Sequence, residues 1–398
     1  MSTARTVKSL VFSTLYPNAA QPVHGVFVER RLLKVVETGR LEARVVAPVP
    51  WFPFDSPRFR AYSAFARVPD RETRHGLQIE HPRYLLPPKI GMSAAPLLMA
   101  LATLSTVRRL RAEGFDFDLI DAHYYYPDGV AAALLGHWLD RPVTITARGT
   151  DINLIPRYRV PRAWIRWAAR KSGASIAVCE ALRNEMMQIG IDGSSIRVLR
   201  NGVDLALFRP LDRDRARSEL GLGPGRWLLS VGQLIERKGH DIAIRALTLL
   251  PGWSLVIAGD GPLRSELDAL AHRHGVGDRV RFEGSVPQAR LPAFYSAVDA
   301  LVLASSREGW ANVLLESMAC GTPVIASSVW GTPEVVADSA AGTLMSERTP
   351  QGLVDALNLL MAAYPERHAT RAYAERYDWA PTTTGQLTLF EQLAGKAA

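Results

Sequence analysis

The sequence predicts an α/β protein of two domains, and three observations lead to this prediction. Short apolar runs rich in β-branched residues alternate with helical segments, which is typical of parallel sheets covered by helices. The chain has 398 residues, which is too long for one ordinary core. The alternation also restarts at Trp227, after a charged stretch that runs through Arg217. We therefore expect the break between the domains in that stretch.

Composition narrows the class of protein. Apolar residues make up 47% of the chain and charged residues 22%, which are globular values. The two cysteines, Cys179 and Cys320, are expected in different domains, which favours a reducing compartment and gives no disulfide or metal framework. Residues 1–8 lack the apolar core of a signal peptide. The longest apolar stretch, Met92–Val107, contains Pro96 and is short for a membrane span. We expect a soluble or peripheral cytoplasmic protein.

The positive charge lies in the first half of the chain. Residues 1–195 carry 26 Lys and Arg against 17 Asp and Glu, a balance of +9, whereas the whole chain carries +8. An anionic partner would therefore meet the first half. No nucleic-acid recognition motif is present, so an anionic membrane surface or a phosphate-bearing acceptor fits better.

The strands expected in the first domain are Val7–Ser13, Arg44–Val49, Asp118–Ala122, Pro142–Thr146, Ala174–Val178 and Ile196–Leu199. Three loops after these strands hold candidate site residues, because ligands bind beyond the carboxyl ends of parallel strands. Gly25 precedes a helix, where a glycine lets the backbone approach a ligand or simply makes a turn. His123 and Arg148 each follow a strand directly. A histidine there can orient an acceptor or transfer a proton, and Arg148 can pair with an anion.

Aromatic and basic residues are interleaved in two parts of the first half. One is the stretch from Trp51 to Arg67, with Phe54, Phe59, Arg60 and Tyr62 among its members. The other is a helix on which Arg162, Arg166 and Arg170 form one stripe beside Trp164 and Trp167. Both patterns suit an anionic membrane surface or a lipid-linked acceptor. A surface loop and a solvated helix face remain the alternatives.

The strands expected in the second domain are Trp227–Val231, Leu255–Ala258, Val280–Val286, Ala300–Ala304 and Pro323–Ala326. Gly259-Asp260-Gly261 is an incomplete dinucleotide fingerprint, since Arg264 stands where a third glycine is needed. This argues against an NAD enzyme. The Asp116-Phe117-Asp118 and Asp212-Arg213-Asp214 triplets lie on no glycine-rich loop, so we expect both to be structural and infer no metal.

The stretch from Ser305 to Val336 reads as a strand–loop–helix–strand unit with Asn312 as the helix N-cap. Glu308 precedes the helix and Glu316 is expected two turns inside it, about 12 Å away at the helical rise. Between them, the amides from Gly309 to Asn312 would form an anion site. A sugar nucleotide has hydroxyls at both ends and a diphosphate between them. Taken singly, each glutamate is better explained as a loop charge or a solvated helix residue, whereas the pair in this frame favours the ligand site.

Glu308 and Glu316, with seven residues between them, followed by Ala319-Cys320-Gly321-Thr322-Pro323-Val324, resemble the signature of the GT4 family of retaining glycosyltransferases. The resemblance implies a GT-B fold, with two Rossmann-like domains facing across a cleft. The implied domains are an acceptor domain at 1–203 and a nucleotide-sugar domain at 204–375. A terminal helix at 376–398 would cross back to the first domain.

The resemblance also assigns roles to residues of the second half. Glu316 would hold the ribose, Glu308 the donor sugar, and Arg237 and Lys238 the diphosphate. Gln233 stands where relatives have an arginine. Further donor contacts are implied at the helix start and in three other segments: Gly309, Trp310, Ala311, Asn312, Val286, Gly331 and Asn201.

In the first half, the resemblance places Gly25 beside the donor phosphates and His123 near the reacting sugar. Arg148 departs from the pattern, because many relatives carry a histidine there. A teichuronic-acid branch of the family shares the Ala-Arg-Gly-Thr-Asp form that this chain has at 147–151.

These inferences predict a metal-independent retaining hexosyltransferase without a cofactor. It would use a UDP-sugar and a lipid-linked or glycan acceptor in cell-surface polysaccharide or glycolipid synthesis, at the inner face of the cell membrane. The alternatives are a sugar-nucleotide epimerase or hydrolase on the same fold, and a non-catalytic sugar-nucleotide-binding protein.

Overall fold

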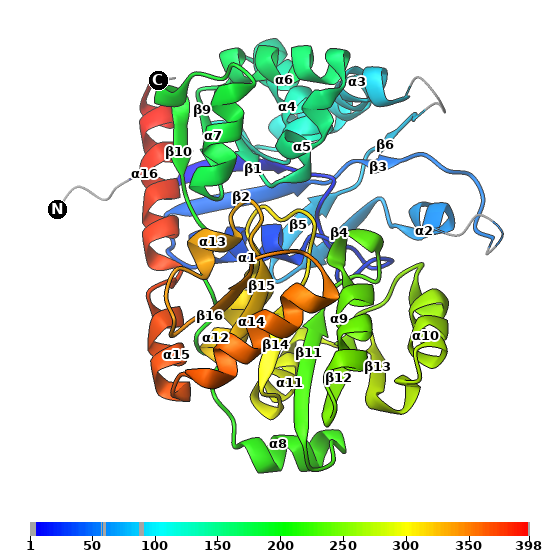
Figure 1. Cartoon of the computed structure of the whole chain (residues 1–398). Helices are drawn as coiled ribbons and strands as arrows, with labels where there is room; N and C mark the ends of the chain where they lie inside the picture. Colours follow the sequence, from blue (N-terminus) through cyan, green and yellow to red (C-terminus); the bar gives the residue numbers. More distant parts are fainter. Residues whose placement is uncertain (1–4, 57, 59–60, 87–90, 397–398) are drawn as a thin grey trace. The chain divides into compact units, whose positions relative to one another are not determined.

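The computed structural model describes residues 5–56, 58, 61–86 and 91–396. The chain forms two compact units (Figure 1). Unit 1 comprises Met1–Arg200 and Pro381–Ala398, and unit 2 comprises Asn201–Ala380. Phe59 and Arg60 of the aromatic-basic stretch lie outside the described residues.

Among its described residues, unit 1 contains an eight-stranded sheet in the order β10-β9-β8-β7-β1-β2-β5-β4. Its strands are β1 Val7–Phe12, β2 Leu41–Val46, β4 Arg71–Arg74, β5 Leu77–Glu80, β7 Leu119–His123, β8 Val143–Ala147, β9 Ala174–Ala177 and β10 Ile196–Val198. All neighbouring pairs are parallel except β4 and β5. The central strands β7 and β8 are buried throughout, as expected where helices cover both faces of a parallel sheet.

The helices of unit 1 connect these strands and cover the sheet. They are α1 Val26–Val36, α2 Ala61–Arg67, α3 Gly91–Ala112, α4 Val130–Leu139, α5 Thr150–Asn153, α6 Arg159–Lys171, α7 Glu180–Gln188 and α16 Ala380–Lys396, with short turns η2 Tyr125–Gly129, η3 Ile155–Arg157 and η4 Gly193–Ser195. Among the helices of the described segments, none is both long and apolar enough to cross a membrane.

One strand of unit 1 lies earlier than the sequence suggested. We expected Arg44–Val49, but β2 ends at Val46. Pro48 follows, and a proline has no amide hydrogen to continue the ladder. The chain then forms β3 Val49–Pro50, which pairs with β6 Arg83–Tyr84 in a separate two-stranded sheet. Between β3 and the expected strand at Asp118, the structure also contains α2, β4, β5 and β6, which were not predicted.

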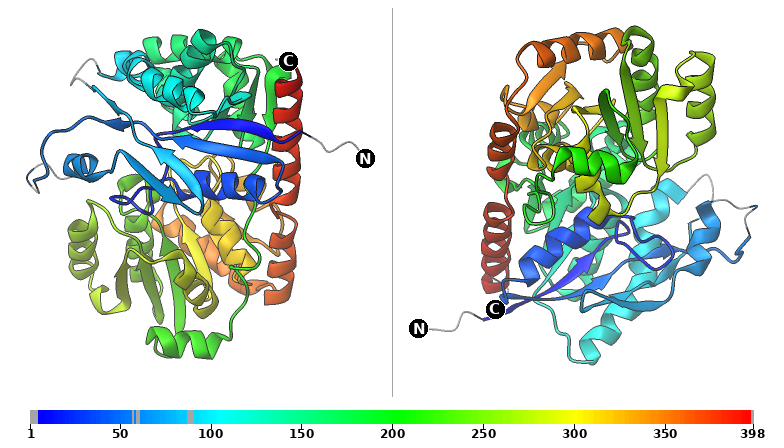
Figure 2. Two further views of the ribbon diagram at one scale, coloured as in Figure 1. Left: turned by 180° about the vertical axis from the view of Figure 1, so that it is seen from behind. Right: turned by 90° about the horizontal axis from the view of Figure 1, so that it is seen from below.

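The C-terminal helix α16 packs on unit 1, as the fold prediction required, and this expectation is confirmed. Leu387 and Phe390 join the core formed by β1, α1 and β2. Leu389 and Leu393 pack on Ala174 and Ile176 of β9. In both views of Figure 2 the helix, drawn in red, lies next to the ends of the blue strands β1 and β2.

Unit 2 contains a parallel sheet in the order β13-β12-β11-β14-β15-β16. Its strands are β11 Arg226–Val231, β12 Trp253–Ala258, β13 Val280–Gly284, β14 Ala300–Leu303, β15 Val324–Ser327 and β16 Gly342–Met345. Five of them match predicted strands. The edge strand β16 was missed, because Gly342-Thr343-Leu344-Met345 is short and only Met345 is buried.

The helices of unit 2 are α8 Arg213–Leu220, α9 His240–Ala246, α10 Arg264–Arg273, α11 Leu291–Ala297, α12 Asn312–Ala319, α13 Thr332–Val335, α14 Pro350–Ala362 and α15 Arg367–Glu375. Short turns are η5 Glu236–Lys238, η6 Leu247–Leu249, η7 Gly277–Arg279 and η8 Gln288–Arg290. The predicted α/β architecture of two parallel-sheet domains is thus confirmed.

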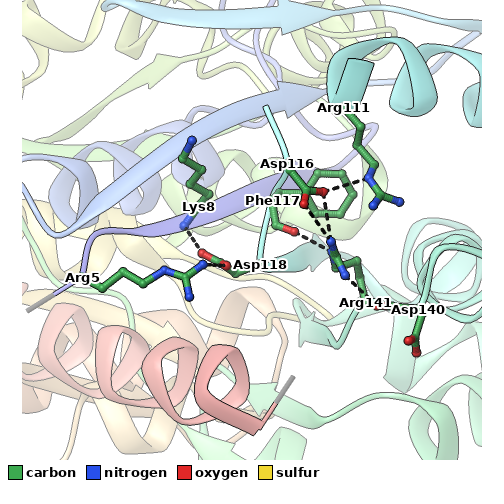
Figure 3. A network of polar contacts seen from close by, with 8 residues as sticks. All are labelled: Arg5, Lys8, Arg111, Asp116, Phe117, Asp118, Asp140 and Arg141. Atoms are coloured by element: carbon green, nitrogen blue, oxygen red, sulfur yellow. Dashed lines mark hydrogen bonds and ion pairs between the residues drawn. The ribbon is translucent and has the colours of Figure 1, made fainter. Parts of the chain in front are cut away.

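Both aspartates of the first Asp-x-Asp triplet bond to arginines (Figure 3). Asp116 accepts hydrogen bonds from Arg111 at 2.9 Å and Arg141 at 3.0 Å. Asp118 accepts from Arg5 at 2.6 Å and from the Lys8 amide at 2.8 Å. These contacts lie where β1, β7 and β8 begin, at the opposite strand ends from His123 and Arg148. Within the described segments, no group of three or more His, Cys, Asp or Glu could hold a metal ion.

Candidate functional site

In unit 2 a buried carboxylate binds two cations. The Lys238 Nζ donates a hydrogen bond of 2.7 Å to the Glu308 Oε1, and the Arg237 Nη1 lies 3.5 Å from the same oxygen. Arg237 also donates to the Arg307 carbonyl at 2.9 Å. Glu308 is only 8% exposed, so the alternative of a solvated loop charge is wrong. The structure brings Glu308, Lys238 and Arg237 together, and their roles toward a donor stay predictions.

Backbone contacts place the two cations beside the strand that precedes Glu308. Gly239 has φ of 69°, and a Cβ there would lie 2.0 Å from the Ala304 carbonyl oxygen. Only glycine permits this close approach. The Ser306 amide donates to the Arg237 carbonyl at 2.8 Å, which fixes η5 against the end of β14. The glycine after Lys238 therefore sets the position of the cations.

Burial and charge act in opposite directions on Glu308. Burial by itself would raise the pKa of this carboxyl, but the charges of Lys238 and Arg237 hold its pKa below the ordinary value. The group is thus an anion at neutral pH. Cations at the start of a helix are unfavourable without an anion, and Glu308 provides one next to Arg237 and Lys238.

Glu316 lies in a second polar contact of unit 2. The Tyr295 hydroxyl donates to its Oε2 at 2.9 Å, and the Gln288 Nε2 lies 3.4 Å from its Oε1. Glu316 is 6% exposed, so it is not a solvated helix residue. Our expectation that it lies two turns inside the helix is wrong, because α12 begins at Asn312 and residues 308–311 are not helical. The helical estimate of the span from Glu308 therefore does not apply.

The start of α12 is held by Asn201. The Trp310 Nε1 donates to the Asn201 carbonyl at 3.0 Å, and the Asn201 Nδ2 donates to the Asn312 Oδ1 at 3.3 Å. Asn312 is therefore not the N-cap that we predicted, since Ala311 takes that position and the Asn312 side chain is engaged by Asn201. The first amides of a helix have no acceptor within the helix. The predicted anion site at Gly309–Asn312 relies on such amides, and it stays a prediction.

Two other predicted residues also belong to unit 2. Val286 follows β13 and is half-buried, two residues before Gln288, which contacts Glu316. Gly331 is buried and precedes α13. Their roles toward a donor stay predictions.

In unit 1, Gly25 stands directly before α1, as predicted. Its φ is 70°, and a Cβ there would lie 2.3 Å from the Leu15 carbonyl oxygen. The close approach to Leu15 is a sufficient structural reason for glycine at this position. A contact between Gly25 and a ligand stays a prediction.

His123 and Arg148, from the ends of neighbouring strands β7 and β8, are in direct contact. The Arg148 Nη2 lies 2.6 Å from the His123 Nδ1, and the His123 Nε2 lies 3.1 Å from an Asp121 carboxylate oxygen. A guanidinium can only donate, so Nδ1 accepts and the proton of the neutral ring is on Nε2. Burial lowers the pKa of His123, and the Arg148 charge lowers it further while Asp121 opposes both effects. The ring is therefore neutral, with Nδ1 bonded to Arg148 and the proton on Nε2, which lies near Asp121 without a well-aligned hydrogen bond.

Asp151 fixes the loop that carries Arg148. Its carboxylate accepts hydrogen bonds from the amides of Tyr125 at 2.7 Å, Gly149 at 2.7 Å and Arg148 at 3.1 Å. Tyr125 belongs to the loop after His123, so one buried carboxylate ties together the loops after β7 and β8. Arg148 also lies over the Phe27 ring of α1, 5.3 Å from its centroid.

Sequence reasoning missed several residues that hold these groups. Tyr295 and Gln288 contact Glu316, and Asp121, Arg31 and Gln386 lie in the network behind His123. Asp121 carried a signal, because an aspartate inside the apolar run 119–122 is unusual. Gln386 carried none, since no local pattern links a residue of α16 to β7.

Two family models cover most of the chain. Residues 35–207 match the model described as Glycosyltransferase Family 4, and residues 212–377 match that of Glycosyl transferases group 1. The D-inositol 3-phosphate glycosyltransferase of Segniliparus rotundus is 36% identical over 213 residues, 50% of this chain and 47% of that protein. This chain thus spans about half the length of the curated relatives that it matches in this way.

Other relatives match over a longer part of the chain. The D-inositol 3-phosphate glycosyltransferase of Xylanimonas cellulosilytica is 32% identical over 71% of this chain and 73% of its own length. TuaC of Bacillus subtilis, named for a teichuronic acid biosynthesis glycosyltransferase, is 28% identical over 88% of each chain.

Solved structures share the fold. Sucrose-phosphate synthase from Thermosynechococcus elongatus superposes with a TM-score of 0.79 at 20% identity, over 98% of this chain and 100% of that chain. Anabaena HepE in complex with UDP superposes with a TM-score of 0.71 at 21% identity, over 98% and 99%. The fold is GT-B. The chain belongs to the GT4 family of glycosyltransferases.

Proposed function

We propose that this protein transfers a sugar from a nucleoside diphosphate to an acceptor with retention of anomeric configuration. The observation that carries the proposal is the buried cluster of Glu308, Lys238 and Arg237 in unit 2, with Glu316 held by Tyr295 in the same unit. Cations fixed in a buried site can stabilise the charge that develops on a leaving diphosphate.

The donor would be held by unit 2. Lys238 and Arg237 would bind the diphosphate, Glu316 would accept hydrogen bonds from the ribose hydroxyls, and Glu308 would accept them from the sugar. Glu308 also holds both cations in place before the ligand arrives, which reduces the cost of ordering them. A uridine base is favoured because the related fold of HepE has been solved with UDP.

The acceptor would be held by unit 1, and we propose that it is anionic. Arg148 presents a cation at the end of β8, and the first half of the chain carries the excess positive charge. A phosphate-bearing lipid-linked or glycan acceptor of cell-surface polysaccharide or glycolipid synthesis would match this charge.

The reaction would break the bond between the sugar C1 and the phosphate oxygen and form one between C1 and an acceptor oxygen. The proton of the acceptor hydroxyl would pass to the leaving phosphate on the same face of the sugar. Lys238 and Arg237 offer the positive charge that a divalent cation supplies in other transferases, so the proposal needs neither a metal nor a cofactor. The NMR signal of the anomeric proton reports the configuration of the product. An inverted anomeric configuration would overturn the retaining mechanism.

Nucleotide binding is the first test. A panel of nucleoside diphosphates and sugar nucleotides is screened by thermal shift, because a ligand that binds the folded state raises the melting temperature. We expect UDP species to raise it for the wild-type protein. In Glu316→Gln, loss of a charged hydrogen-bond acceptor worth about 1.5–3 kcal/mol should weaken binding roughly 10- to 100-fold.

Glu266→Gln is the matched control, because Glu266 is an exposed glutamate on α10 of the same unit. It should keep the full shift. If no nucleotide shifts the wild-type protein, the donor proposal fails. If UDP-sugar binds and is altered without an acceptor, the epimerase or hydrolase alternative replaces transfer. If UDP-sugar binds but neither a glycosylated acceptor nor a hydrolysis product forms, the non-catalytic alternative replaces transfer.

We also propose that unit 1 binds an anionic membrane surface at the inner face of the cell membrane. Leu97 and Leu101, at 40% and 53% exposure, lie four residues apart on α3. The exposed arginines Arg162, Arg166 and Arg170 lie on α6. Helices α3 and α6 contact each other and both pack on α4 (Figure 1). An apolar stripe beside a basic stripe suits an anionic bilayer interface.

Co-sedimentation with vesicles tests this surface. We expect the protein to sediment with phosphatidylglycerol vesicles far more than with phosphatidylcholine vesicles. Leu97→Ser/Leu101→Ser should weaken the binding by about tenfold or more, given roughly 1.5–3 kcal/mol for each fully buried leucine. The control is Leu249→Ser/Leu359→Ser, which changes two exposed leucines of unit 2. Equal binding by the two double variants would contradict the proposed surface.

A further inference from the structure

A chain of buried polar groups links the C-terminal helix to Arg148. The Arg31 Nε donates to the Gln386 Oε1 at 2.7 Å, and the Gln386 Nε2 donates to the Asp121 Oδ2 at 3.1 Å. The same aspartate oxygen lies 3.1 Å from the His123 Nε2, and the His123 Nδ1 lies 2.6 Å from Arg148. All of these residues belong to unit 1.

Burial makes the pairing of each group in this chain obligatory. Arg31, Asp121 and His123 are each 1% exposed, and Gln386 on α16 is also 1% exposed. An unpaired polar group at such depth costs about 1–3 kcal/mol, so each group is expected to keep its partner. The Thr144 hydroxyl donates to the other Asp121 oxygen at 2.8 Å.

The hydrogen-bond directions along the chain are determined by Arg31 and Arg148, because arginine can only donate. The Gln386 side chain must therefore turn its amide oxygen toward Arg31 and its NH2 group toward Asp121. Asp121 then presents an acceptor oxygen to both Gln386 and His123. Because Arg148 donates to the His123 Nδ1, the ring proton is on Nε2, which lies 3.1 Å from that oxygen.

We propose that Gln386 is a positioning residue for Arg148, acting through residue 121 and the His123 ring. The inference rests on the proposed function, in which Arg148 binds an anionic acceptor. It extends that function by giving the last helix of the chain a role in acceptor binding, although no residue of α16 was predicted to take part.

The test uses the variant Asp121→Asn, because an asparagine amide has one accepting end and one donating end. In Asp121→Asn alone, Gln386 still donates, so the new amide must turn its oxygen toward Gln386 and His123. Its NH2 group then faces the Thr144 hydroxyl, which can accept. His123 should keep its proton on Nε2, and the acceptor KM should change by less than about threefold, because no hydrogen bond is lost.

Adding Gln386→Glu reverses the amide at residue 121. The new carboxylate can only accept, so in Asp121→Asn/Gln386→Glu the asparagine must turn its NH2 group toward residue 386 and His123. The His123 Nε2 then faces a donor, and the ring proton must move to Nδ1, where it opposes Arg148. We expect the acceptor KM to rise about tenfold or more, the worth of one good hydrogen bond.

Two measurements on the full-length chain separate positioning from a structural role. Nitrogen NMR of the histidine rings, with His123→Asn to assign the signal, should show the Nε2–H form in the wild-type protein and in Asp121→Asn, and the Nδ1–H form in the double variant. The double variant should melt near the wild-type temperature, because its negative charge moves from residue 121 to residue 386, which bonds to Arg31. The single variant removes the charge of Asp121 that interacts with Arg31 and should melt lower.

The same tautomer in all three proteins would overturn the inference, and so would an acceptor KM that follows the melting temperature. The NMR readout does not require transferase activity. If the chain transfers no sugar but the tautomer switches, the proposed function fails while the positioning of Arg148 by Gln386 stands.

Discussion

Glu308→Gln is expected to lower the kcat for sugar transfer by on the order of 10²–10³-fold, the usual effect of removing one preorganised electrostatic group. The substitution keeps the shape of the side chain but removes the charge that binds Lys238 at 2.7 Å and Arg237 at 3.5 Å. The two cations would then repel each other without the anion between them. Steady-state kinetics with a UDP-sugar measures the effect.

Nucleotide affinity separates this effect from a loss of the donor site. The Glu316 contacts with Tyr295 and Gln288 do not involve Glu308. Binding of UDP by Glu308→Gln should therefore persist and should fall less than kcat does, because only the ordering of Lys238 and Arg237 is lost from the donor site. Glu266→Gln again serves as the exposed control. Full activity in Glu308→Gln would show that the cluster is structural.

Arg148→Met should have the second large effect, a loss of about 100-fold in kcat/KM for an anionic acceptor. Charged hydrogen bonds are worth about 1.5–3 kcal/mol, which corresponds to factors of roughly 10 to 100. The change also removes a cation 2.6 Å from the His123 Nδ1. That cation is one of the causes that lower the pKa of His123, so the pKa of His123 should rise in the variant.

The pH dependence of stability checks the second prediction independently of catalysis. Burial and Arg148 hold the pKa of His123 below its ordinary value of 6.5. Above pH 6.5, histidine is neutral in both the folded and the unfolded chain, and its full contribution to stability is present. As the pH falls below 6.5, the unfolded chain takes up the proton first, so this contribution is lost.

In Arg148→Met the His123 pKa lies closer to 6.5, so the melting temperature should fall less steeply between pH 6.5 and 5 than in the wild-type protein. Arg170→Met, which changes an exposed arginine on α6, should keep the wild-type slope. A slope in Arg148→Met equal to that of the wild-type protein would contradict the contact between Arg148 and His123.

Local sequence patterns determined most of the parallel strands and the residues that end them. Apolar runs such as 119–122 and 300–304 are buried on both sides, so composition alone reveals them. The spacing of Glu308 and Glu316, and the Arg237-Lys238 pair before Gly239, were likewise visible as local motifs. These groups could be predicted because each lies next to the strand or turn that holds it.

Tertiary structure alone decided which side chains meet. Lys238 reaches Glu308 because the backbone at Gly239 lies against Ala304, a contact between segments some 65 residues apart. Gln386 joins Asp121 across 265 residues because α16 returns to unit 1. Local pattern carries no information about such pairs, since it reports periodicity and turn chemistry but not which loops pack together.

The sequence determined the strands, the turns and the kinds of group at their ends. Only packing decided that His123 is held neutral between Asp121 and Arg148, because that state depends on three side chains from two strands and on their burial from water.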